Sequence, residues 1–299
     1  MKIDPTDPLP PTKPEVSRRG FVALGAGAAA GIANAAAAGA QTDGFGKPHP
    51  PIVAEDDPAI AVSRPTLQPK AGTPIGSYAA MPRSITRLTP GVVVIQAASG
   101  VDPQLRDVVR RLAKAGFIAI APSLFDRVKP PDPSGIDFSV AAPIMAQMSA
   151  QGFVPTDVIA AHDWLQTQAK DASLGIIGFC MGGGIVLQSI IDSHAFSAAS
   201  MFYGNVRPGT DPKAPTTASA FDFTSRITTP LLGSFGARDT SIKPADVTAM
   251  FARLTAPHAV KIYDEAGHAF FDDTRDRYIP SAAADAWART LDWFRKYLT

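Results

Sequence analysis

The sequence has 299 residues, of which 45% are hydrophobic and 18% are charged, so it can bury one large core or two of ordinary size. Lys and Arg number 28 against 27 Asp and Glu, and this formal net charge of +1 gives no electrostatic footprint for nucleic acid. The single cysteine excludes an intrachain disulfide.

Residues 1–40 have the pattern of an export signal. Arg18 and Arg19 precede an apolar stretch, residues 21–40, that consists mostly of Ala and Gly. An arginine pair before such a stretch is typical of the bacterial twin-arginine signal, and Ala and Gly contribute too little transfer energy for a membrane anchor. We expect recognition by the twin-arginine export machinery, a periplasmic or secreted mature form, and no membrane association of that form. The alternative is an Ala-rich tail with a chance arginine pair.

Residues 41–83 are expected to form a proline-rich N-terminal arm before a catalytic domain at residues 84–299. Of the 28 prolines, 14 lie in residues 1–90. Proline has no backbone N–H, so this segment cannot be a continuous strand within a sheet. We expect only short edge strands in it, near residues 61–67 and 75–81.

From residue 91 onward, short apolar runs alternate with helical patterns. The first predicted helix is apolar on one face, and its arginines lie on the other. Alternation of this kind predicts an α/β protein with a mostly parallel central sheet and helices on both faces. The predicted strands are residues 91–96, 117–121, 174–179, 198–203, 230–235 and 259–263, and the predicted helices are residues 103–115, 154–169, 181–191, 244–254 and 282–298.

Cys180 lies in a Gly-x-Cys-x-Gly motif between a predicted strand and a predicted helix. This is the setting of a nucleophile elbow, in which small neighbours permit a tight turn. The helix N-terminus favours the thiolate over the thiol. The alternative is an inert buried cysteine, but the motif favours a nucleophile.

Two further residues could act together with Cys180. Asp239 follows the predicted strand at 230–235, and His268 follows the one at 259–263. Functional groups of open α/β sheets gather at the carboxyl ends of strands, where a carboxylate can orient a histidine. Asp239 could instead cap a helix or a turn. The other four histidines lie in predicted helices, in loops or in the arm, and we expect them to be structural or solvated.

From about residue 91 to the C-terminus the sequence resembles the dienelactone hydrolases, also called carboxymethylenebutenolidases. The resemblance implies an α/β-hydrolase fold and a triad of Cys180, Asp239 and His268, in the nucleophile–acid–base order of that fold. It also implies hydrolysis of an ester or lactone through an acyl-enzyme, with neither a metal nor an organic cofactor. The matching stretches are residues 178–183 (GFCMGG), 202–204 (FYG), 236–239 (GARD) and 263–270 (YDEAGHAF).

The resemblance further assigns binding positions. The backbone N–H groups of Met181 and Ala98 correspond to the oxyanion hole. Tyr203 corresponds to a tyrosine near the substrate pocket, although it could equally be a core aromatic at a strand end.

Three departures from the family pattern concern the substrate. Ala97 stands where the family usually carries a glutamate that contacts the thiol. Residues 130–169 contain no Arg or Lys, so the first of two arginines that hold a substrate carboxylate is missing. Asp272 occupies the place of the second, and Arg275 is the candidate replacement. The stretch 138–148 offers Val140, Ile144, Met145 and Met148 instead, which suits an apolar acyl group.

These departures leave the reaction open among three alternatives. The first is a dienelactone hydrolase-like esterase or lactonase. The second is a general carboxylesterase or thioesterase that acts on neutral esters. The third is a catalytically silent periplasmic binding protein, and the presence of all three triad residues argues against it.

Overall fold

The computed structural model describes residues 49–129, 132, 134–210 and 215–298. The predicted export signal and the first residues of the arm therefore lie outside the described residues. Among the described helices, none is both long enough and apolar enough to cross a bilayer.

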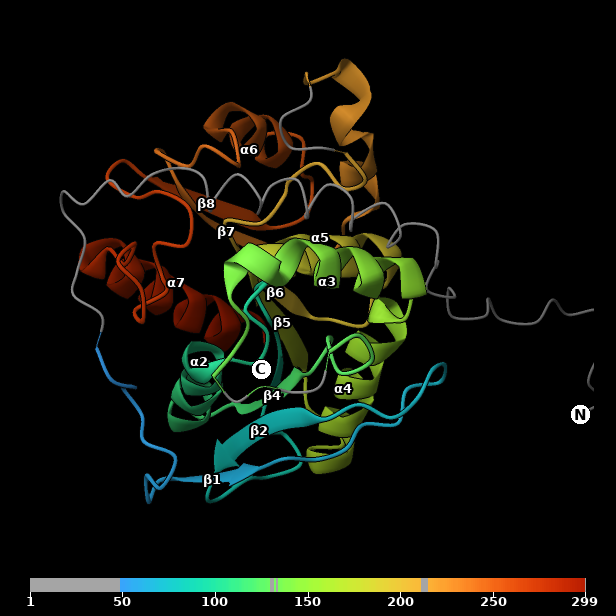
Figure 1. Cartoon of the computed structure of the whole chain (residues 1–299), viewed down its shortest axis with the longest axis vertical. Helices are drawn as coiled ribbons and strands as arrows, with labels where there is room; N and C mark the ends of the chain where they lie inside the picture. The colour runs from blue at the N-terminus through green and yellow to red at the C-terminus, as the bar shows by residue number, and fades with distance from the viewer. Residues whose placement is uncertain (1–48, 130–131, 133, 211–214, 299) are drawn as a thin grey trace, which may run out of the picture.

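A single eight-stranded sheet runs through the described part of the chain (Figure 1). Its strand order is β1-β2-β4-β3-β5-β6-β7-β8, with β2 antiparallel to both β1 and β4 and all other pairs parallel. The predicted mostly parallel sheet is thus confirmed. The strands are β1 (Ile60–Ser63), β2 (Ser77–Pro82), β3 (Gly91–Ile95), β4 (Ile118–Pro122), β5 (Leu174–Phe179), β6 (Ala198–Phe202), β7 (Leu231–Gly236) and β8 (His258–Tyr263).

Helices cover both faces of the sheet, as predicted (Figure 1). The chain moves from β3 outward to β4 and then back past β3 to β5. Because such crossovers are right-handed, α2 lies on one face and α4 and α5 lie on the other. α7 returns to the face of α2, where Phe294 packs against Phe117. The helices are α2 (Pro103–Lys114), α3 (Phe138–Gln151), α4 (Val154–Gln168), α5 (Met181–Asp192), α6 (Pro244–Phe251) and α7 (Pro280–Tyr297), with a 3-10 helix η1 (Ala218–Arg226).

The core lies along the central strands. All five residues of β3, β4 and β6 are buried, and all six of β5 and β7 are buried as well. Parallel strands that are covered on both faces have continuous apolar sequences rather than alternating ones, which is why these strands were visible in the sequence. The covered sheet gives a rigid base for the residues at its carboxyl edge.

Three observations differ from the sequence-based expectations. The helices α3 and η1 were not predicted. The two strands of the arm are shorter or shifted, and Leu67 and Ile75 form only an isolated bridge between them. The arginine face of α2 is not a solvated face, because Arg110 and Arg111 are only 4% and 8% exposed. The arm and the loop before α7 cover this face through contacts that the helical period alone does not indicate.

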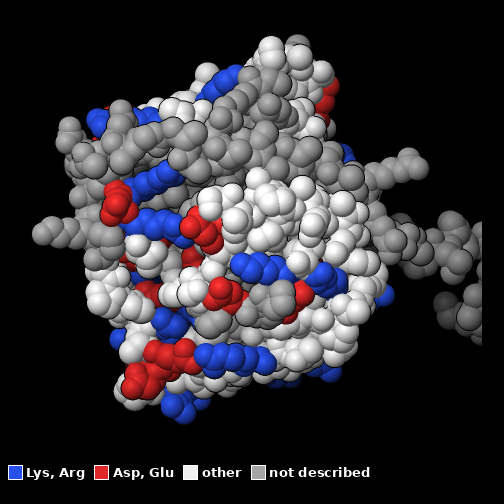
Figure 2. Space-filling view, in the orientation of Figure 1, with Lys and Arg blue, Asp and Glu red and all other residues white. Residues whose placement is uncertain are grey.

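The visible surface carries both signs of charge. Figure 2 shows Lys and Arg interspersed with Asp and Glu on the face seen in Figure 1, without one large patch of a single sign. This agrees with the nearly balanced charges of the sequence.

Candidate active site

Cys180 lies at the turn between β5 and α5. Its φ of 55° is in the left-handed region, which is uncommon for a residue with a side chain. The Cys180 N–H donates to the carbonyl of Phe202 at 3.0 Å, and the Cys180 carbonyl accepts from Gly183 N–H at 3.0 Å. The residue thus belongs to the sheet on one side and to the helix on the other, and only 8% of it is exposed.

Two glycines make this turn possible by close backbone contacts. A Cβ atom at Gly178 would lie 2.3 Å from the carbonyl oxygen of Gly182. A Cβ atom at Gly182 would lie 2.4 Å from the carbonyl oxygen of Ile95, at the end of β3. A side chain at Gly178 would therefore push α5 away from β5, and one at Gly182 would push α5 away from the end of β3. The Gly-x-Cys-x-Gly motif has a direct steric cause.

The structure brings Cys180, His268 and Asp239 together in series. His268 Nε2 lies 3.1 Å from Cys180 Sγ, and His268 Nδ1 lies 2.7 Å from Asp239 Oδ2. The other carboxylate oxygen of Asp239 accepts from the backbone N–H groups of Ser241 at 2.7 Å and Ile242 at 2.9 Å. The carboxylate is therefore fixed by the backbone, and it in turn fixes the imidazole.

The charges around His268 favour its protonated form. Burial acts to lower the pKa of His268, but the negative charges of Asp239 and Cys180 outweigh it and raise this pKa well above its ordinary value. An imidazolium beside Cys180 stabilises the thiolate, which is the nucleophilic form of the side chain. The arrangement can therefore hold a reactive sulfur and can move a proton between Sγ and Nε2.

The two predicted oxyanion-hole positions lie on adjacent segments. Met181 is the first residue of α5, and Ala98 is buried in the turn that follows β3. Gly182 packs directly against the carbonyls at the end of β3, so these two segments touch. Ala97 begins the turn, and its carbonyl accepts from Gly100 N–H at 3.1 Å. That the N–H groups of Met181 and Ala98 bind an oxyanion stays a prediction.

Tyr203 is buried beside the imidazole. It directly follows β6, has a φ of 38°, and its ring centroid lies 5.2 Å from that of His268. Burial, together with the nearby carboxylates, raises the pKa of Tyr203 well above its ordinary value, so the phenol is neutral. Tyr203 is thus a buried core aromatic beside His268, and its part in substrate binding stays a prediction.

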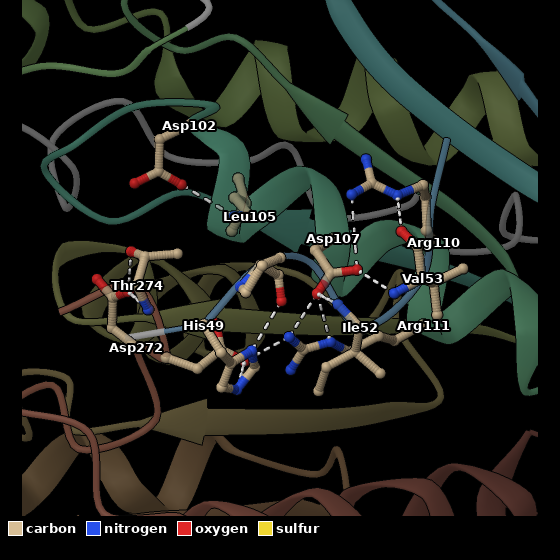
Figure 3. Close-up of polar contacts among 12 residues, drawn as sticks. His49, Ile52, Val53, Asp102, Leu105, Asp107, Arg110, Arg111, Asp272 and Thr274 are labelled. Atoms are coloured by element: carbon tan, nitrogen blue, oxygen red, sulfur yellow. Dashed lines mark hydrogen bonds and ion pairs between the residues drawn. The ribbon is translucent and has the colours of Figure 1, made fainter. Parts of the chain in front are cut away.

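Arg275 is paired with Asp272, the residue expected to stand in the place of a family arginine. Its Nε lies 2.9 Å from Asp272 Oδ2, and Asp272 also accepts from Thr274. Asp102, the buried N-cap of α2, lies on the same side of the molecule (Figure 3). Burial, and then the negative charge of Asp272, raise the pKa of Asp102. Asp102 was not among the residues predicted for the site, although an Asp directly before Pro103 is a recognisable helix start.

Comparisons with known proteins show the family of the chain. The model of the dienelactone hydrolase family matches residues 75–298. Proteins from Salmonella typhimurium and Escherichia coli, both provisionally named carboxymethylenebutenolidase, are each 32% identical to the chain. The matches cover 83% and 82% of this chain and 92% and 91% of those proteins.

A solved structure agrees as well. A provisionally named dienelactone hydrolase from Klebsiella pneumoniae superimposes with a TM-score of 0.69 at 30% identity, over 80% of this chain and all of that one. The predicted α/β-hydrolase fold is thereby confirmed.

Proposed function

The chain belongs to the dienelactone hydrolase family of carboxylic-ester hydrolases, and we propose that it cleaves esters or lactones with Cys180 as the nucleophile. The observation that carries the proposal is the series Cys180–His268–Asp239, with separations of 3.1 Å and 2.7 Å, at a nucleophile elbow. A buried structural cysteine would need neither the strained turn nor a histidine oriented by a carboxylate.

The first half of the proposed reaction acylates Cys180. Cys180 reacts as the thiolate, with its proton held on His268 Nε2, and Sγ attacks the carbonyl carbon to form a tetrahedral oxyanion near the N–H groups of Met181 and Ala98. As this intermediate collapses, the bond from carbon to the alkoxy oxygen breaks. His268 then gives its proton to that oxygen, which leaves a thioester on Cys180. With a lactone, the alcohol stays attached to the acyl group.

The second half releases the acid. His268 accepts a proton from a water molecule, whose oxygen attacks the thioester carbonyl. The tetrahedral intermediate expels the Cys180 thiolate, which regains the imidazolium charge beside it. Asp239 stays ionised throughout, because its role is to orient His268 and to stabilise the cation.

We also propose that neutral substrates are preferred over anionic ones. The positive charge of Arg275 is opposed by Asp272 at 2.9 Å, and Asp102 adds a second buried acidic group to this side. A substrate carboxylate bound there would lack a favourable partner for its charge. Residues 138–148 in α3 carry no positive charge either, and they bury the apolar side chains of Met145 and Met148.

A substrate panel tests both proposals. p-Nitrophenyl esters of increasing acyl length, a neutral lactone, an acyl thioester and the anionic dienelactone would be compared on the wild type and Cys180→Ala. We expect turnover that depends on Cys180, with a higher kcat/KM for the neutral compounds than for dienelactone. Unchanged rates in Cys180→Ala would reject the nucleophile, and efficient dienelactone turnover would reject the charge preference. A higher kcat/KM on the thioester would identify a thioesterase.

The location of the protein is a separate proposal. It rests on Arg18 and Arg19 and on the apolar stretch after them, which lie outside the described residues. We propose that the twin-arginine machinery exports the chain to the periplasm or beyond.

A further inference from the structure

The histidine of the proposed triad lies in an irregular loop. Residues 264–279 connect β8 to α7 without any helix or strand. The backbone hydrogen bonds of this loop include those from Arg238 N–H to Ala266 O at 2.9 Å and from Ile279 N–H to Phe270 O at 3.0 Å. A loop of this kind needs further support if it is to hold His268 at a fixed distance from Cys180.

A buried arginine supplies such support. Asp273, five residues after His268, forms an ion pair with Arg111 of α2. Arg111 also binds Asp107, one turn earlier on the same helix, through Nε at 2.8 Å. The exposed side-chain fractions of Asp273, Arg111 and Asp107 are only 4%, 7% and 2%. One guanidinium therefore joins α2 to the histidine loop in an environment that is largely closed to water.

The N-terminal arm closes over this pair (Figure 3). Asp107 accepts from the N–H groups of Ile52 at 2.8 Å and Val53 at 2.9 Å. Arg110 donates through Nε to the carbonyl of Val53 at 2.6 Å, and the N–H of His49 donates to the carbonyl of Asp273 at 3.1 Å. We call this assembly of Asp107, Arg111, Asp273 and arm residues 49–53 the arm clamp.

An aromatic contact links the arm clamp to the nucleophile. Phe271 lies between His268 and Asp273 in the sequence, and its ring stacks on that of Phe179 with centroids 5.4 Å apart. Phe179 directly precedes Cys180. The guanidinium carbon of Arg111 lies 6.0 Å from the Phe271 ring centroid. Displacement of Arg111 would therefore affect the ring that packs the histidine loop against the elbow.

We propose that Arg111, held in the arm clamp, is a positioning residue that keeps His268 Nε2 within hydrogen-bonding distance of Cys180 Sγ. Loss of its charge would remove the guanidinium that joins the two buried carboxylates; Asp107 would keep Arg110 at 3.5 Å, whereas Asp273 would keep the imidazole of His49 at 3.7 Å. Repulsion between the two carboxylates would move the loop, and with it the imidazole of His268, away from Sγ. The proposal rests on the function proposed above, since His268 acts there as the base.

The test compares Arg111→Met with a control in an equally buried ion pair. Asp157 on α4 binds Arg127, with side chains 1% and 9% exposed, and is outside the arm clamp. For Arg111→Met we expect kcat to fall about 10- to 100-fold with little change in KM, because a misplaced base affects the chemical step. Alkylation of Cys180 by iodoacetamide at neutral pH should slow as well, because the thiolate depends on His268. Asp157→Asn should lower Tm without changing either rate.

Asp273→Asn provides a second test if Arg111→Met does not fold. It keeps the size of the side chain but weakens the bond to Arg111, and we expect a smaller loss in both rates. If both variants lose Tm as the control does and keep the wild-type kcat and alkylation rate, Arg111 is structural only and the proposal is wrong.

The two proposals fail in distinguishable ways. Turnover by the wild type that does not depend on Cys180 would reject the proposed function. The alkylation rates would still report whether the arm clamp positions His268 beside the thiol. An Asp273→Glu variant, which restores the charge, should recover part of the alkylation rate that Asp273→Asn loses.

Discussion

At the scale of single residues, the charge of His268 links the site to the stability of the fold. Because its pKa is raised in the folded protein, its protonated form stabilises the fold fully below the unfolded value of about 6.5. That contribution is lost as the pH rises through the raised folded value. We therefore expect the unfolding free energy of the wild type, relative to that of His268→Gln, to be lower at about pH 10 than at about pH 6. Urea unfolding at both pH values measures it, and a shift in favour of the wild type would contradict the proposed ion pair.

The residue at position 97 is expected to influence how readily the Cys180 thiol ionises. A carboxylate at this position would disfavour the thiolate by repulsion and could accept a hydrogen bond from the neutral S–H. We expect Ala97→Glu to slow the alkylation of Cys180 at neutral pH by about tenfold, while Ala97→Gln, of similar size and without charge, changes it much less. Equal rates in the two variants would mean that residue 97 does not face the sulfur.

At the scale of elements, the elbow is closely constrained by the backbone of its neighbours. Gly182→Ala would place Cβ 2.4 Å from the backbone oxygen of Ile95, which no rotamer change can relieve. We expect a loss of roughly 1–3 kcal/mol in unfolding free energy and a larger proportional loss of activity. Gly267→Ala is the matched control for stability, since its Cβ would meet nothing closer than 3.8 Å. Similar unfolding curves for the two variants would refute the steric account.

Most elements could be predicted because their sequences agree with the local structure. β5 and α5 were located to within a residue, since an apolar strand pattern and a helical pattern meet at the elbow. α3 was missed because Pro143 lies inside it, where proline is unfavourable for a helix, and because its Ala- and Met-rich sequence has no clear polar face. Its boundaries are nonetheless regular, as Asp137 caps the start and Gly152, with a φ of 68°, ends it.

The site was predictable only in part, because local sequence patterns do not show contacts between distant segments. Cys180, Asp239 and His268 were found because each follows a strand and their order matches that of a known fold. The arm clamp was not found, since Arg111 and Asp273 are 162 residues apart and nothing local in the sequence pairs them. The helical pattern of α2 indicated an exposed arginine face, whereas tertiary contacts bury it.

At the scale of the whole molecule, the arm is joined to the catalytic body. β1 and β2 come from the proline-rich segment 41–83, yet they pair within the same sheet as β4. Residues 49–53 add polar contacts to α2 and the histidine loop. The part of the chain next to the predicted export signal is thus also the part that supports the site.

Export is tested by changing the arginine pair. Replacing both Arg18 and Arg19 by Lys keeps the charge but removes the guanidinium groups that the twin-arginine machinery is expected to read. The variant should accumulate inside the cell at full precursor length, while the wild type appears outside the cytoplasm. Cell fractionation followed by immunoblotting measures this, and undiminished export of the Lys-Lys variant would contradict the signal.

The central claim is that the reaction passes through an acyl group on Cys180. Rapid mixing with p-nitrophenyl acetate, acid quenching and intact-protein mass spectrometry measure this directly. The account predicts a transient mass increase equal to one acetyl group, located by digestion on the peptide that contains Cys180 and absent from Cys180→Ala. It also predicts that this species persists longer in His268→Ala, because water attack then lacks its base. Acetylation at another residue, with turnover retained in Cys180→Ala, would contradict the account.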